Sequence, residues 1–140
     1  MFRNRTLFAT GLCLILGIFA MGAYRAGLNA APAEDKELAI SHNVYFTLKD
    51  STAETKAKLL ASINKYLSKP EGSLAFAAGT RAEEFTGSVN DKEFDVVLLL
   101  VFKNKEAFDN YAKSEPHKQF IAENLASLKS ARVFDSRISH

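Results

Sequence analysis

The chain has 140 residues, a length that suggests one domain. Its formal net charge of +2 arises from the N-terminal part, because three of the 18 Lys and Arg residues but none of the 16 Asp and Glu residues precede residue 34. Residues 34–140 are therefore near neutral, which gives no support for nucleic-acid binding. The single cysteine, Cys13, lies outside this part, so disulfides, thiolate nucleophiles and zinc–cysteine sites are excluded from it.

Residues 1–33 are typical of an N-terminal signal peptide. Arg3 and Arg5 provide the positive start, a long apolar run follows, and small residues after it offer cleavage sites. An uncleaved membrane anchor is the alternative, because the apolar stretch at 6–24 is just long enough to span a bilayer. In either case we expect the folded part to be exported to the periplasm or the extracellular space, with the membrane contacted only through this segment.

A short charged linker is expected at 34–40, followed by a strand at 41–49. Alternation places His42 on one face of this strand together with Val44, Phe46 and Leu48. If that face meets helices, the imidazole of His42 points into an apolar pocket. There it either takes part in binding or proton transfer, or is simply a buried histidine bonded to a neighbour.

The first helix is expected at 52–67. Ser51 and Glu54 fit a capping box at its start. An apolar stripe that includes Leu60 and Ile63 should face the sheet, and these two residues join the first-strand residues as candidate ligand contacts.

The sequence 94–102 is the most apolar stretch of the chain after residue 34, and only Asp95 interrupts it. Nine residues are too few to span a bilayer as a helix, and the valines favour a strand. Both faces of this strand are apolar, so both need to be covered. One face is expected to meet the chain's own helices, whereas Val97, Leu99 and Val101 on the other face call for the sheet of a second copy.

The remaining elements complete a βαββαβ order. A strand is expected at 74–82, with a bulge or close approach at Gly79. Helices are expected at 105–113 and 116–128, and a last strand at 131–138. Two βαβ halves of this kind predict an α+β fold: a ferredoxin-like sandwich with a four-stranded antiparallel sheet and helices on one face.

Several segments together resemble the stress-responsive dimeric α/β-barrel (Dabb) domain family. They are the first strand at 42–49, the stretch from Phe94 to Lys103, the pair Ala107 and Tyr111, His117-x-x-Phe120, and the ending Arg-Val-Phe-Asp at 132–135. The resemblance covers about residues 40–138, which makes 41–140 the Dabb-like domain. It implies a homodimer in which two sheets pack face to face as a dimeric α+β barrel.

The resemblance also implies candidate catalytic residues. In one relative, olivetolic acid cyclase, a tyrosine and a histidine six positions later act in a pocket between sheet and helices, near a first-strand histidine. By position these resemble Tyr111, His117 and His42. The chain departs from the usual family pattern at Pro116, which directly precedes His117, and the first histidine of that pattern is missing.

Three functions remain open. The first, which we prefer, is a homodimer that binds a small apolar ligand between sheet and helices without turnover. The second is a cyclase-type or lyase-type enzyme acting on a carbonyl or polyketide-like compound, in which His117 takes a proton and Tyr111 stabilises charge on oxygen. The third is a cofactor-free monooxygenase of the same dimeric fold. No cofactor or metal is expected, because the sequence has no glycine-rich phosphate loop and no metal-ligand spacing.

Overall fold

The computed structural model describes residues 38–139. The predicted signal or anchor segment at 1–33 lies outside them. Among the described residues, no helix is both long and apolar enough to cross a membrane. The elements, in chain order, are β1 (Ala39–Leu48), α1 (Ala53–Leu67), β2 (Ser73–Thr80), β3 (Val96–Phe102), α2 (Lys105–Lys113), α3 (Glu115–Asn124), the 3-10 helix η1 (Leu125–Ser127) and β4 (Leu128–Ile138).

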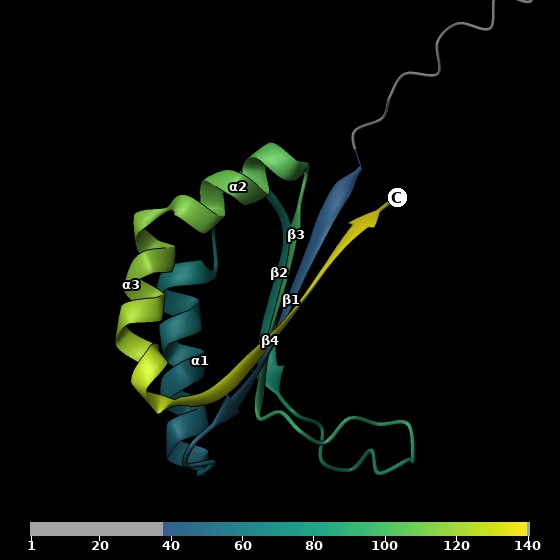
Figure 1. Ribbon diagram of the computed structural model, residues 1–140, viewed down its shortest axis with the longest axis vertical. Helices are drawn as coiled ribbons and strands as arrows, with labels where there is room; N and C mark the ends of the chain where they lie inside the picture. Colours follow the sequence, from purple (N-terminus) through teal and green to yellow (C-terminus); the bar gives the residue numbers. More distant parts are fainter. Residues whose placement is uncertain (1–37, 140) are drawn as a thin grey trace, which may run out of the picture. The chain divides into compact units, whose positions relative to one another are not determined.

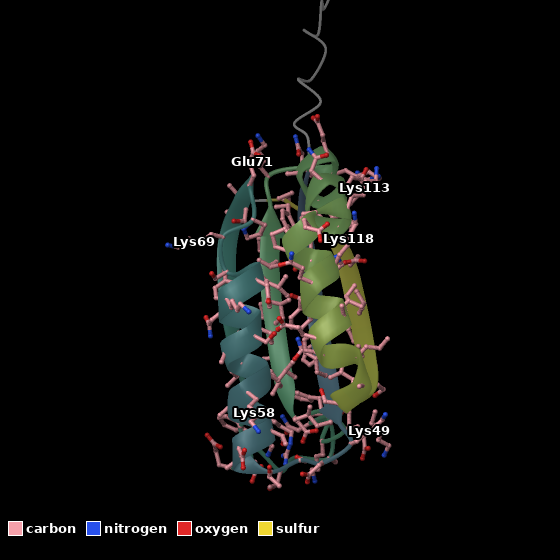
Figure 2. The ribbon with its side chains drawn as sticks, turned by 90° about the vertical axis from the view of Figure 1, so that its left-hand side faces the viewer. Lys49, Lys58, Lys69, Glu71, Lys113 and Lys118 are labelled. Atoms are coloured by element: carbon pink, nitrogen blue, oxygen red, sulfur yellow. The ribbon has the colours of Figure 1, made fainter. Side chains whose placement is uncertain are left out.

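The four strands form one antiparallel sheet in the order β2-β3-β1-β4. The helices lie on one side of this sheet (Figure 1). Helices α1 and α3 run next to each other along the strands (Figure 2). This arrangement is the ferredoxin-like α+β sandwich that the element order predicted, and the prediction is confirmed.

Strand alternation separates the two faces of the sheet as expected. Val96, Leu98 and Leu100 of β3 are almost fully buried under the helices. They pack there with apolar residues of α1 such as Leu59 and Ile63. A fully buried side chain of this size contributes about 1.5–3 kcal/mol. These contacts therefore hold the helix layer on the sheet.

The opposite side of the sheet is not covered by any helix of the described residues (Figure 1). We call it the open face. Leu99 on this face is 37% exposed, and its neighbours Val97 and Val101 are half-buried. Strand pairing sets these side chains beside Ser41, Asn43 and Tyr45 of β1, which in turn pair with β4, where Arg132 and Phe134 share the face.

Some predicted boundaries differ from the structure. Strand β1 begins at Ala39, inside the predicted linker. The last helix ends at Asn124 instead of continuing to residue 128, because the chain tightens into η1 and then enters β4 at Leu128. The bulge expected at Gly79 is absent, and the register of β2 shifts between Ser73 and Ala75 instead.

The predicted capping box of Ser51 and Glu54 is also wrong. Thr52 is the N-cap of α1: its hydroxyl accepts from the Thr55 N–H, and the Thr55 hydroxyl accepts from the Thr52 N–H. Glu54 instead forms an ion pair with Lys58 one turn later, with Nζ and Oε1 2.7 Å apart.

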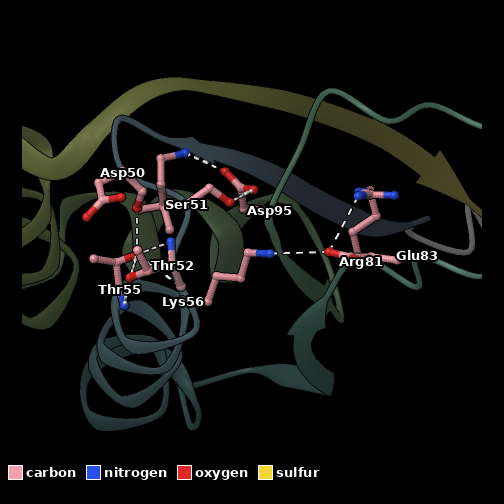
Figure 3. A network of polar contacts seen from close by, with 9 residues as sticks. Asp50, Ser51, Thr52, Thr55, Lys56, Arg81, Glu83 and Asp95 are labelled. Atoms are coloured by element: carbon pink, nitrogen blue, oxygen red, sulfur yellow. Dashed lines mark hydrogen bonds and ion pairs between the residues drawn. The ribbon is translucent and has the colours of Figure 1, made fainter.

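Ser51 is used in a contact with Asp95, the one acidic residue of the apolar run. The Asp95 carboxylate accepts from the Ser51 hydroxyl and, at 2.7 Å, from the Leu48 N–H (Figure 3). The Asp95 N–H donates to the Phe46 carbonyl at 2.8 Å. Asp95 thus joins the start of β3 to the end of β1 and to the turn before α1, and the strand proper begins one residue later.

Candidate ligand pocket

A cavity of about 310 Å³ lies between the sheet and the helices. Its surface is almost entirely apolar. The lining residues are His42, Val44, Phe46, Leu67, Leu98, Tyr111, His117, Phe120, Ile121, Asn124, Leu125, Leu128, Ala131 and Val133. Ile121, Leu125 and Val133 are also exposed to solvent. The cavity therefore opens between the helical segment formed by α3 and η1 on one side and strand β4 on the other.

His42 lies on the central strand β1 and is only 8% exposed. Its Nδ1 is 2.6 Å from Oδ1 of Asp135, which is the residue paired with it on β4. A carboxylate accepts hydrogen bonds, so Nδ1 carries a proton, and in the neutral form of the ring the lone pair is on Nε2. Asp135 thus fixes both the tautomer and the orientation of the His42 ring.

His117 lies in the first turn of α3, after the N-cap Ser114, whose hydroxyl accepts from the His117 N–H at 3.3 Å. Its Nδ1 is 3.0 Å from the Ala112 carbonyl oxygen. A carbonyl also only accepts, so Nδ1 again carries a proton, and in the neutral form of the ring the lone pair is on Nε2. Hydrogen bonding thus selects the same tautomer for the neutral form of both histidines.

Tyr111 lies between the two histidines near the end of α2. Its ring centroid is 4.8 Å from that of His117 and 5.8 Å from that of His42. Within residues 38–139 its hydroxyl makes no hydrogen bond. Burial raises the pKa of the Tyr111 phenol well above its usual value. The group therefore stays protonated and is available to donate a hydrogen bond to an oxygen in the cavity.

The structure brings together most of the residues that the sequence singled out. His42, Val44, Phe46, Tyr111 and His117 all line this one cavity. The arrangement combines apolar walls with a phenolic donor and two imidazole rings. It suits a small molecule that is mostly apolar and carries an oxygen function, and it also suits proton transfer at such a molecule.

Leu60 and Ile63 do not line the cavity. Ile63 is completely buried in the core between α1 and the sheet. Leu60 is partly buried and borders a separate surface hollow beside Lys56 and Arg81. In their place α1 contributes Leu67, one turn beyond Ile63.

Sequence reasoning missed Asp135 as the partner of His42, and it missed the cavity mouth. The signal for Asp135 was present in the register, because an antiparallel pairing of the first and last strands sets position 135 opposite position 42. The position of the cavity mouth depends on where α3 ends, and no local pattern in the sequence indicated that this helix ends early. Among residues 38–139, no group of three or more His, Cys, Asp or Glu side chains is placed to hold a metal ion.

The sequence profile of the stress responsive A/B barrel domain matches residues 40–138, nearly all of the described fold. The chain belongs to this family. No curated protein shows a significant match to the chain.

Solved structures share the Dabb fold with this chain at low sequence identity. A Dabb family protein with a ferredoxin-like fold from Mesorhizobium loti is 20% identical over 74% of this chain and 100% of its own, with a TM-score of 0.61. A dimeric ferredoxin-like protein of unknown function from Thermobifida fusca is 12% identical over 74% of this chain and 93% of its own, with a TM-score of 0.60. The hydroxynitrile lyase of Passiflora edulis is 18% identical over 75% of this chain and 96% of its own, with a TM-score of 0.59.

Proposed function

We propose that this Dabb protein is a homodimer, exported or tethered to a membrane by its N-terminal segment, that binds a small apolar molecule carrying an oxygen function. The observation that supports it most directly is the apolar cavity of about 310 Å³, which is lined by Tyr111, whose hydroxyl makes no hydrogen bond within residues 38–139. The volume is within the range of small-molecule pockets, which have apolar walls and a few placed polar groups.

The homodimer is supported by the open face of the sheet. Val97, Leu99 and Val101 form an apolar strip there that no helix of residues 38–139 covers. The related protein from Thermobifida fusca is described as dimeric. Export or tethering is supported by the sequence of residues 1–33 alone.

Binding is tested with a pair of probes, 2-heptanone and 1-heptene, which differ chiefly in the ketone oxygen. We expect both to bind the full chain in isothermal titration. Tyr111→Phe removes one hydroxyl, so it should weaken binding of the ketone by about tenfold and leave the alkene unchanged. Leu60→Ala is the control, since Leu60 lies outside the cavity. If neither probe binds, or if Tyr111→Phe weakens both equally, the proposed role of the cavity is wrong.

An enzyme acting on a carbonyl compound is the second candidate, favoured by the contact between the Tyr111 and His117 rings. In such an enzyme His117 Nε2 takes a proton next to a carbonyl, and Tyr111 donates to the resulting oxyanion. With a panel of polyketide-like and dicarbonyl compounds, His117→Ala should lower kcat by about 10²–10⁴-fold. Equal rates for wild type and variant would remove this candidate. Oxygen consumption with a quinol, measured in parallel, tests the monooxygenase alternative.

A further inference from the structure

The connection between β2 and β3 is much longer than their pairing requires. The two strands are neighbours in the sheet, and Thr80, the last residue of β2, pairs with Val96, the first residue of β3. Turns of two to five residues commonly join such strands, yet residues 81–95 intervene here. Figure 1 shows this loop projecting from the end of the sheet toward the side away from the helices. Loops of this length in compact domains usually have a function.

The loop is fastened to the sheet. Asp91 Oδ2 accepts from Arg132 Nη1 of β4 at 2.7 Å. The Glu93 carbonyl accepts from the Thr47 hydroxyl of β1 at 2.6 Å. A turn closes within the loop, where the Asn90 N–H donates to the Gly87 carbonyl at 3.0 Å. The loop is therefore anchored to the sheet at Asp91 and Glu93 and contains one closed turn.

Two apolar side chains of this fastened loop are exposed. Phe85 is 62% exposed and Val89 is 94% exposed. Exposed apolar side chains that occur singly are ordinary, but these two lie on a segment that stands out beside an apolar sheet face. Nothing in residues 38–139 covers them.

A hollow of about 450 Å³ lies between the loop and the open face. Phe85 and Asp91 border it from the loop, and Tyr45, Arg132 and Phe134 border it from the sheet. Because both the loop and the sheet border the hollow, a group that fills it would contact both of them.

We propose that residues 81–95 form a clasp that grips a second copy of this chain. The inference rests on the proposed homodimer through the open face and adds to it. Stacked sheets lie about 10 Å apart, so a loop that projects on the open side must run beside the sheet of the partner. Phe85 and Val89 pack on the partner there, and side chains of the partner enter the hollow. Each hollow is thus completed only by two copies.

Fluorescence of the full chain in detergent reports on the clasp, because the sequence contains no tryptophan. In Phe85→Trp, the emission should move to shorter wavelength as the concentration rises through the dimer dissociation constant given by sedimentation equilibrium. In the control Ala61→Trp, at an exposed position of α1, it should not move. Emission typical of water at concentrations where the chain is dimeric would overturn the clasp. Short-wavelength emission in the monomer would also overturn it, because another segment or a bound small molecule would then cover the side chain at position 85.

Sedimentation equilibrium of substituted chains tests the clasp separately from the proposed dimer. Replacing Phe85 and Val89 together by Ala should raise the dissociation constant by about 100-fold, about tenfold for each of the two copies. If Leu99→Asp abolishes the dimer but the loop variant does not weaken it, the clasp is wrong and the homodimer stands. If the wild-type chain is monomeric at all concentrations, both proposals are wrong.

Discussion

Asp95 explains how one acidic side chain is tolerated within the most apolar strand. Partial burial alone would raise the pKa of its carboxyl. The hydrogen bonds from Ser51 and the Leu48 N–H, together with the positive charges of Lys56 and Arg81, outweigh that effect and hold the pKa below its usual value. The carboxylate is therefore the form that the fold prefers.

Removing this carboxylate should destabilise the protein. Asp95→Ala leaves the Leu48 N–H without its acceptor, and we expect a loss of about 1–3 kcal/mol in the free energy of unfolding at pH 7, measured by urea denaturation. The control is Asp109→Ala, which removes only an exposed pair with Lys105 and should have a much smaller effect.

The effect should also depend on pH. Because the pKa of Asp95 is lower in the folded state, its contribution is complete above the unfolded value of about 3.9 and is lost as the pH falls through the folded pKa. The stabilities of wild type and Asp95→Ala should therefore converge in acid. A difference that stays constant down to pH 2 would show that the carboxylate charge is not the cause.

At the scale of the elements, the turn between α1 and β2 depends on Gly72. Its φ is 75°, in the left-handed region, and an added Cβ would lie 2.6 Å from the Cβ of Ala107 on α2. The Lys103 N–H donates to the Gly72 carbonyl at 3.0 Å. This turn thus contacts the start of the second helical segment and sets where β2 enters the sheet.

Gly72→Ala should therefore be destabilising. The left-handed conformation alone costs about 1–2 kcal/mol for a residue with a Cβ, and the contact with Ala107 adds to it. Gly79→Ala is the matched control, because its Cβ would meet nothing within 4 Å. Thermal unfolding of both variants checks this, and equal midpoints would contradict the assigned role of Gly72.

The sequence predicted the type and order of all the strands and α-helices described, because apolar residues and helix-starting or helix-breaking residues mark the segments. It did not predict the ends that depend on distant contacts. Ser51 and Thr52 are both good N-caps, and the choice between them is made by Asp95, which lies 44 positions after Ser51. Strand and helix patterns were enough to find the cavity residues of β1 and α2. They could not place Leu60 and Ile63 correctly or identify Asp135, because those positions depend on how distant segments pack.

At the scale of the whole molecule, the dimer should depend on the open face. Leu99→Asp places a carboxylate where the proposed partner sheet would bury it without a counter-charge, at a cost of about 3–5 kcal/mol per copy. Light scattering should then show a monomer or an aggregate. Ala61→Asp, on the helix side, is the control and should remain dimeric. Unchanged size and solubility of Leu99→Asp would show that this face is not the interface.

The two apolar faces of β3 predict such a partner from the sequence alone. What the pattern could not show is that the long loop at 81–95 stands beside that face, because the largely polar sequence of this loop has no periodicity to locate it. Its position follows from Arg132 and Thr47, which hold it from two other strands.

The cavity opens on the helix side of the sheet, and the proposed partner lies on the other side. A single layer of backbone separates them, and the neighbours His42 and Asn43 face opposite ways. A ligand could therefore enter and leave each subunit while the two subunits stay together, so its exchange rate should not change with protein concentration.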